Sequence, residues 1–211
     1  MITFDPIPKM FFNPKFKNYR ISNFNQKIEI LKSYNIDFII NKKFDKKFSK
    51  TKYTNFIKNV LYKKIKPKYI FVSDNFRFGN KREGDVSSLK QFEKVYGYKI
   101  INPSPLKKNL KIVSSTLIRK YLSEGKIKVA NKYLDRNWSI EGLVKIGRRM
   151  GRQIGFPTCN IDIDDYIITK PGVYSVKVKI GKNNKKYNGI ANIGYRPCLL
   201  YTSPSPRDTR E

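Results

Sequence analysis

The sequence predicts two domains of different fold class, an α/β domain followed by an all-β domain. Up to about residue 134, short apolar strands alternate with helices, which is the pattern of a parallel, doubly wound sheet. From Trp138 onward the period changes to short alternating strands broken by glycine and polar turns, which is typical of antiparallel β structure. At 211 residues, the chain is long enough to bury a core in one large or two small domains.

In the first half, residues 1–4 are expected to be the end of a buried strand. This strand must end where Asp5-Pro6-Ile7-Pro8 follows, because two prolines cannot continue a hydrogen-bonded ladder. Apolar spacing predicts a helix over residues 22–34 with Ser22 as its N-cap. The other elements of this half are strands at 36–40, 69–72 and 99–101 and helices at 53–64, 87–96, 121–125 and 126–134. In the second half, strands are expected at 139–145, 173–180 and 186–193.

The chain carries 45 basic and 16 acidic residues, which give a net charge of +29. One interpretation is a basic nucleic-acid-binding protein, because a positive surface binds nucleic acid through counterion release. The other is a composition effect, since Lys, Asn, Ile, Tyr and Phe are in excess together, as an AT-rich coding sequence produces. Lysine is spread along the whole chain rather than gathered on one helix, which favours the composition effect and makes a nucleic-acid partner the weaker expectation.

Several classes of site are excluded by composition. The chain has no histidine, which rules out serine–histidine catalysis and histidine-ligated metals. Cys159 and Cys198 are too few for a zinc site or a disulfide framework and suit a reducing cytoplasm. No apolar run approaches the roughly 20 residues that span a bilayer, so a cytoplasmic protein without a membrane partner is expected. Nothing in the sequence indicates an oligomeric state.

A glycine-spaced segment over residues 147–160 carries the clearest chemistry and reads G-R-R-M-G-R-Q-I-G-F-P-T-C-N. Its spaced glycines and arginines can bring backbone N–H groups and cations close to a phosphate. Thr158 and Asn160 follow two residues apart, so that on a strand both would point to one side and offer Mg²⁺ two neutral oxygen ligands. The segment therefore predicts a Mg-ATP site, although an ordinary Gly/Arg-rich turn would look similar. Its ATP-binding candidates are Gly147, Gly151, Arg152, Gly155, Thr158 and Asn160.

Two further segments are candidates for binding anions or nucleotides. Ser115, Thr116 and Arg119 stand where a helix begins, which is a ready anion site or, more simply, an ordinary serine cap. Asn75 follows the strand expected at residues 69–72, and ligands of doubly wound sheets bind at the carboxyl ends of strands. The phenylalanines that flank Arg77 are expected to pack rather than to stack on a ligand.

These segments resemble the motifs of the bacterial bifunctional riboflavin kinase/FAD synthetases. Residues 147–160 resemble the family's G-x-x-x-G-R-x-x-G-F-P-T-A-N, and residues 188–197 are similar to G-V-A-N-I-G-x-R-P-T. Residues 3–8, 73–79 and 113–119 look like T-F-D-P-H-P, G-x-N/D-F-x-F-G and I-S-S-T-x-I-R, with Ile7 in place of the usual histidine. The resemblance implies a Rossmann-like nucleotidylyltransferase domain over 1–134, followed by a small Greek-key β-barrel over 135–198.

The resemblance also implies roles for individual residues. Ser115, Thr116 and Arg119 would hold ATP phosphates in the adenylyltransferase domain, and Asn75 would contact ATP or flavin. Flavin contacts are also implied for Asp5 and Pro6, whereas Thr158 and Asn160 would hold Mg²⁺ and ATP in the kinase domain. ATP, riboflavin and FMN would be the substrates. A nucleotidylyltransferase relative acting on another substrate is a further alternative, which the kinase-like segment argues against.

Some family elements have no counterpart in this sequence. The histidine-bearing loop G-x-F-D-G-x-H-x-G-H is absent, and no residue matches the glutamate that acts as general base in the kinase. No catalytic residue is therefore assigned, Glu211 included, and both domains are expected to be incomplete with little activity of either kind. The strand before the missing loop is central in sheets of order 3-2-1-4-5, so the strands that pair through it are expected to be separated. Residues 199–211 contain no Lys, Asn or Ile and are expected to be a non-native tail.

Overall fold

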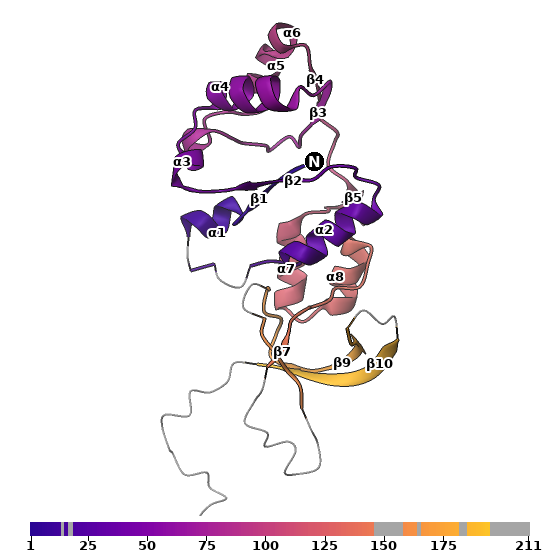
Figure 1. Ribbon diagram of the computed structural model, residues 1–211. Coiled ribbons are helices and arrows are strands. Elements are labelled where there is room, and N and C mark those ends of the chain that lie inside the picture. Colours follow the sequence, from indigo (N-terminus) through magenta and orange to yellow (C-terminus); the bar gives the residue numbers. More distant parts are fainter. Residues whose placement is uncertain (14, 17–18, 146–157, 164–165, 182–184, 195–211) are drawn as a thin grey trace, which may run out of the picture.

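The computed structural model describes residues 1–13, 15–16, 19–145, 158–163, 166–181 and 185–194. Helices and short strands of the first half occupy the upper and middle parts of the molecule, and a long two-stranded ribbon, β9 and β10, lies at the other end (Figure 1). Helices α7 (Ser115–Ser123) and α8 (Ile127–Leu134) lie between these parts. The arrangement agrees with an α/β region followed by β structure.

The first half contains two separate pairs of parallel strands. Strand β1 (Ile2–Asp5) pairs with β2 (Ile40–Lys43), and β3 (Tyr69–Phe71) pairs with β4 (Lys99–Ile101). Neither pair is hydrogen-bonded to the other. The parallel direction and the separation of the two pairs were both expected from the sequence, and β1 ends at the Asp5-Pro6 step where the prolines begin.

Strand β2 lies several residues later than the sequence suggests, so the expected strand at 36–40 is wrong. The partner strand sets the register, with Ile2 opposite Ile40 and the Ile40 N–H donating to the Met1 carbonyl over 2.8 Å. Phe38, in the expected strand, is 81% exposed, and its carbonyl accepts from the terminal ammonium group of Met1. An apolar run that has no strand residues opposite it to pair with therefore stays outside the sheet.

The helices follow the expected periodicity, with local corrections. Helix α2 (Phe24–Ser33) is capped by Asn23, not Ser22, because the Asn23 side chain accepts from the Gln26 N–H over 2.7 Å. The helix expected at 87–96 is interrupted at Phe92. The remaining helical elements of this half are α1 (Pro8–Phe12), α3 (Lys46–Ser49), α4 (Tyr53–Asn55), the π-helix η1 (Phe56–Ile65), η2 (Asn80–Arg82), α5 (Val86–Gln91) and α6 (Glu93–Tyr96).

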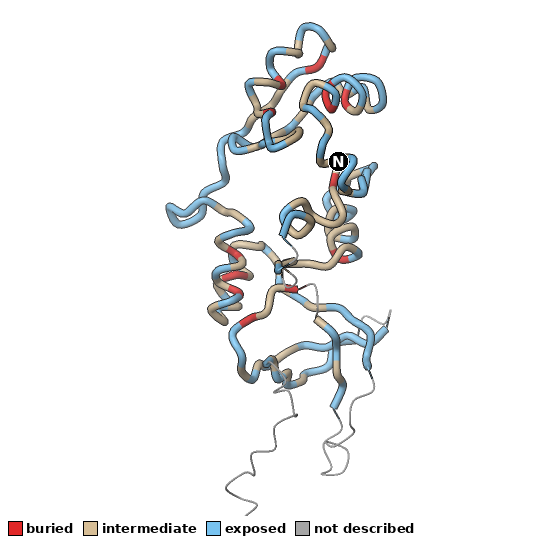
Figure 2. Tube along the Cα trace, turned by 90° about the vertical axis from the view of Figure 1, so that its left-hand side faces the viewer, coloured by how far each residue is buried: buried red, intermediate tan, exposed pale blue. Residues whose placement is uncertain are grey.

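Two small apolar cores hold these elements, and the buried residues fall in short, separate stretches of the chain (Figure 2). The upper core contains Phe56, Ile57, Leu61, Leu89 and Tyr98. Burial raises the pKa of Tyr98 to about 12, and its hydroxyl donates to the Leu89 carbonyl. As expected, the phenylalanines on either side of Arg77 pack against this core.

The second core joins the two halves of the chain. Ile118, Leu122 and Ala130 of helices α7 and α8 are buried together. Trp138 and Ile167, from beyond the helices, pack against them. Thr169 is only 2% exposed, and its hydroxyl donates to the Leu122 carbonyl over 2.7 Å. The start of the β region is therefore fixed to helix α7.

Within its described residues, the second half forms two antiparallel strand pairs. Strand β7 (Val144–Lys145) pairs with β8 (Asn160–Ile161), and β9 (Gly172–Lys179) pairs with β10 (Lys186–Ile193). The long pair was predicted correctly, but only the last two residues of the strand expected at 139–145 form one. Earlier in that segment, the Ser139 carbonyl and the Glu141 N–H bond to side chains instead of a neighbouring strand. The described residues do not close a barrel.

A short hairpin before α7 was not predicted from the sequence. It consists of β5 (Lys107–Lys108) and β6 (Lys111–Ile112), joined by Asn109 and Leu110 at φ values of 50° and 60°. Two positive φ values are typical of the turns that join two-residue hairpins. Leucine is an unusual residue there, because its Cβ crowds the backbone in this conformation.

Replacing Leu110 by glycine is expected to stabilise the protein by about 1 kcal/mol. The Leu110 side chain is 98% exposed, so its removal sacrifices no packing, and glycine adopts the observed φ without strain. The midpoint of urea unfolding measures the effect. Leu106→Gly, at an exposed site without a positive φ, is the control and should destabilise; an equal response of the two variants would contradict the explanation.

Candidate functional site

A charged cluster surrounds the end of β1. The Arg20 guanidinium donates to the Asp5 carboxylate over 2.5 Å, and the side chain of Arg20 is only 11% exposed. Close by, the Lys27 ammonium group donates to the hydroxyl of buried Thr3. Burial lowers the pKa of Lys27, and Arg20 lowers it further, while Asp5 opposes them. Arg20 and Lys27 thus both lie near the Asp5 carboxylate, next to Pro6.

The first turn of α7 presents the second group of candidates. Ser114 caps the helix, its hydroxyl accepting from the Leu117 N–H over 3.2 Å, so this segment does mark a helix start, as expected. Ser115 and Thr116 are exposed. Arg119, one turn later, donates to the Ser115 hydroxyl over 3.0 Å. Exposed hydroxyls, unpaired first-turn N–H groups and a guanidinium form the usual elements of an anion site.

Two consecutive residues connect these groups. The Arg119 Nε donates to the Tyr19 carbonyl over 2.8 Å, and its guanidinium lies 3.7 Å from the centre of the Tyr19 ring. The next residue, Arg20, makes the ion pair with Asp5. The structure therefore brings together Asp5 and Arg119, which are distant in sequence.

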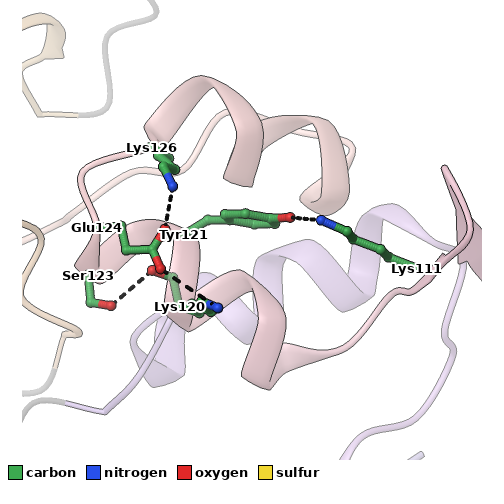
Figure 3. Close-up of polar contacts among 6 residues, drawn as sticks. All are labelled: Lys111, Lys120, Tyr121, Ser123, Glu124 and Lys126. Carbon is green, nitrogen blue, oxygen red and sulfur yellow. Dashed lines mark hydrogen bonds and ion pairs between the residues drawn. The ribbon is translucent and has the colours of Figure 1, made fainter.

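The far end of α7 is held by exposed polar contacts (Figure 3). Glu124 pairs with Lys126 at 2.7 Å and with Lys120 at 4.0 Å, and the hydrogen bond from Lys126 is the main reason why its pKa is lowered. Lys111, from the hairpin, donates to the Tyr121 hydroxyl over 3.3 Å. Exposed pairs of this kind stabilise little by themselves, but they fix the corner between α7 and α8.

Asn75 lies beyond the carboxyl end of β3, where the sequence predicts it. It is exposed, and its side-chain oxygen accepts from the Ser73 hydroxyl over 2.8 Å. No described contact joins it to Asp5 or to Arg119. Its grouping with the other candidates therefore remains a prediction.

The glycine-spaced segment falls mostly outside the described residues, including Gly147, Gly151, Arg152 and Gly155. Thr158 is exposed and precedes β8, so it is not in a strand, contrary to the expectation. Asn160 is half-buried and begins β8, opposite Lys145. Neither side chain is buried in apolar packing. Within the described ranges, no group of three His, Cys, Asp or Glu residues could hold a metal.

Tyr19, Arg20 and Lys27 are site residues that the sequence does not reveal. They lie in loops or helices without a motif, and their partners are 15 to 100 residues away along the chain. The only local signal was the mixture of basic and aromatic residues after Lys9, which could equally be a surface composition effect.

Comparison with known proteins now identifies the family. The sequence model described as FAD synthetase matches residues 1–117, more than half of the chain. The chain belongs to the bifunctional riboflavin kinase/FAD synthetase family. A second model, described as riboflavin kinase, matches residues 134–205. These matches do not favour the interpretation that the high positive charge of the chain serves nucleic-acid binding.

Relatives in the family carry both functions in their names. The bifunctional riboflavin kinase/FMN adenylyltransferase of Buchnera aphidicola subsp. Schizaphis graminum is 43% identical over 201 residues, covering 95% of this chain. The protein of that name from Escherichia coli K12 is 32% identical over 199 residues, covering 94% of this chain. The chain spans 64% and 63% of the lengths of these two family members.

A solved structure of similar fold is described as a macrolide-efflux protein from Streptococcus pneumoniae. It is 26% identical to the present chain and has a TM-score of 0.77. The match covers 92% of the present chain and 62% of the solved chain. The efflux function belongs to the description of that protein. No helix in the described part of the present chain has both the length and the apolar character to cross a bilayer.

Proposed function

We propose that this chain has the binding framework for two ATP-dependent reactions of flavin cofactor synthesis, although it is expected to turn over little substrate, because it lacks the histidine-bearing loop and the kinase glutamate. The half up to Leu134 would transfer AMP from ATP to FMN, and the half from Asp135 onward would transfer the γ-phosphoryl group of ATP to riboflavin. The names of the relatives and the two matched family models support this assignment. The observation that carries it is the position of Arg119 beside Ser115 in the first turn of α7.

The start of α7 would hold the ATP phosphates in the adenylyl transfer. The backbone N–H groups of Ser115 and Thr116 belong to the first turn, which has no intrahelical acceptors for them. Helix N-termini attract anions for this reason and through the helix dipole. The Arg119 guanidinium would add a permanent positive charge, which suits the charge that spreads over phosphate oxygens during transfer.

The flavin would lie nearer to the ends of β1 and β3. Asp5 is the last residue of β1, Pro6 follows it directly, and Asn75 lies beyond β3, so all three belong to the carboxyl edges of parallel strands. Ligands of doubly wound sheets bind at this edge. The Arg20–Asp5 ion pair would fix the carboxylate, and the neighbouring Lys27 would add positive charge for the FMN phosphate.

In the kinase half, Thr158 and Asn160 would hold Mg²⁺ with the ATP phosphates. Their hydroxyl and amide oxygens fit this ion, which keeps several waters or phosphate oxygens and takes few protein ligands. When bound, Mg²⁺ neutralises phosphate charge and orients the transferred group. Gly147, Gly151, Arg152 and Gly155 would surround the phosphates with N–H groups and a cation.

Isothermal titration with Mg-ATP tests the assignment of α7. We expect the native chain to bind ATP saturably and Arg119→Ala to bind it at least about tenfold more weakly, the loss of one charged hydrogen-bonding group. Lys90→Ala removes an exposed cation on α5 and should leave the affinity unchanged. The proposal fails if the native chain shows no saturable ATP binding and instead retains nucleic acid with a steep salt dependence.

A further inference from the structure

The segment Tyr19–Ile21, called here the strap, runs between the two halves of the chain. On one side, the Arg20 carbonyl accepts from the Ile167 N–H over 2.8 Å, and the Ile21 carbonyl accepts from the Trp138 indole N–H over 2.8 Å. On the other side, the Arg20 side chain bonds to Asp5. The strap is therefore fixed by residues of the β region while it lies against the candidate ATP site.

Tyr19, at the start of the strap, contacts Arg119 in two ways. Its carbonyl accepts from Nε of the guanidinium, and its ring lies 3.7 Å from the central carbon. The carbonyl sets the direction of one N–H group, and the ring sets the plane of the whole guanidinium. With Ser115 accepting from Nη1, three contacts restrain the orientation of the guanidinium. A preoriented guanidinium loses less entropy when it binds a phosphate.

The Tyr19 ring also attracts a second cation. The Lys9 ammonium group lies 4.7 Å from the ring centre and 4.6 Å from the centre of the Phe16 ring. Among the described residues, neither Lys9 nor Arg119 forms an ion pair with a carboxylate. Burial lowers the pKa of Arg119, and Tyr19 opposes that change. Two cations gathered on one ring without a counter-charge are suited to receive an anion.

We propose that Tyr19 is a positioning residue that aligns Arg119 for the phosphates of ATP, with the β region holding Tyr19 in place through the strap. The inference rests on the proposed function for the identity of the anion. It adds a residue with no place in the family motifs described above and makes the geometry of the ATP site depend on contacts with the second half.

Three variants and two ligands test this role in the full chain. Tyr19→Leu removes the ring but keeps the carbonyl, and should weaken Mg-ATP binding about five- to tenfold, the worth of a partly desolvated cation–π contact. Adenosine, which has no phosphate, should bind equally well to the native chain and to this variant. Tyr19→Phe keeps the ring and should restore the ATP affinity. Tyr34→Leu, at a 65% exposed tyrosine after α2, is the matched control. Equal losses for ATP and adenosine, or no loss, would overturn the proposal.

The NMR signal of the Arg119 Nε–H tests the same inference without ATP. In the native chain it should be protected from exchange and shifted upfield by the ring, and Tyr19→Leu should abolish the ring shift. This readout separates the two proposals. A native chain that does not bind ATP but shows the signal supports the positioning of Arg119 and refutes the ATP assignment. A signal that Tyr19→Leu leaves unchanged refutes the role of Tyr19 whatever the chain binds.

A change in the fluorescence emission of Trp138, whose indole bonds to the strap, would show that Tyr19→Leu also disturbs the strap. A double-mutant cycle would then test whether Tyr19 acts through Arg119. Arg119→Lys keeps the charge but cannot make the same combination of ring stacking and Nε hydrogen bond. In that background, Tyr19→Leu should cost no further ATP affinity. Losses that multiply independently in the double variant would show that Tyr19 does not act through Arg119.

Discussion

Leu122→Ala is expected to lower the free energy of unfolding by about 3 kcal/mol, as deletion of a fully buried leucine typically does. Leu122 has no exposed surface and packs in the core shared by α7, α8 and the residues that follow them. Its backbone carbonyl also accepts from the buried Thr169 hydroxyl, which restricts how far the helix can move to fill the cavity. A rigid surround leaves a larger cavity and a larger loss.

Urea unfolding followed by Trp138 fluorescence measures this loss, because Trp138 is the only tryptophan and packs against the same core. Leu143→Ala, at an 86% exposed leucine in the second half, is the control and should change stability by less than about 0.5 kcal/mol. If Leu122→Ala were as mild as the control, the second core would not be what joins the two halves.

The parts of the fold that the sequence predicts well are those set by local periodicity. Strands β3 and β4 lie within one residue of their expected bounds, because apolar spacing is a local signal. Helix α7 begins at the predicted serine and threonine segment, although it starts six residues before the helix expected at 121–125. The long β9–β10 pair was found for the same reason. Elements whose bounds depend on pairing with a distant segment were predicted less accurately. Strand β2 begins where β1 requires it, and the segment before β7 gives its hydrogen bonds to side chains of α2 and Tyr166.

The residues of the candidate site also differ in how far the sequence predicts them. Ser115, Thr116 and Arg119 could be located because they belong to one continuous motif at the start of a helix. Tyr19 could not, because its role depends on contact with Arg119, 100 residues later, and no spacing rule joins the two. The exposed positions of Asn75 and Thr158 are compatible with ligand binding, but motifs alone could not say which strand ends come together.

Gln26→Leu is expected to cost about 2 kcal/mol of folding free energy, although leucine is the more apolar residue. The Gln26 side chain is buried and uses its full hydrogen-bonding capacity. Its oxygen accepts from the Asn23 N–H and from the Tyr166 hydroxyl. Its nitrogen donates to the carbonyl and the hydroxyl of Ser139. Leucine would leave the Asn23 N–H and the buried Tyr166 hydroxyl with fewer partners, and the cost of unpaired buried groups exceeds the gain from apolar burial.

The matched control is Gln91→Leu at an exposed glutamine of α5, which should be nearly neutral in the same unfolding experiment. Tyr166→Phe removes the facing hydroxyl and should itself destabilise by about 1 kcal/mol. Because both changes disrupt one network, the double variant should lose less than the sum of the two single losses. Strict additivity would mean that the two side chains stabilise the junction between α2 and the β region independently of each other.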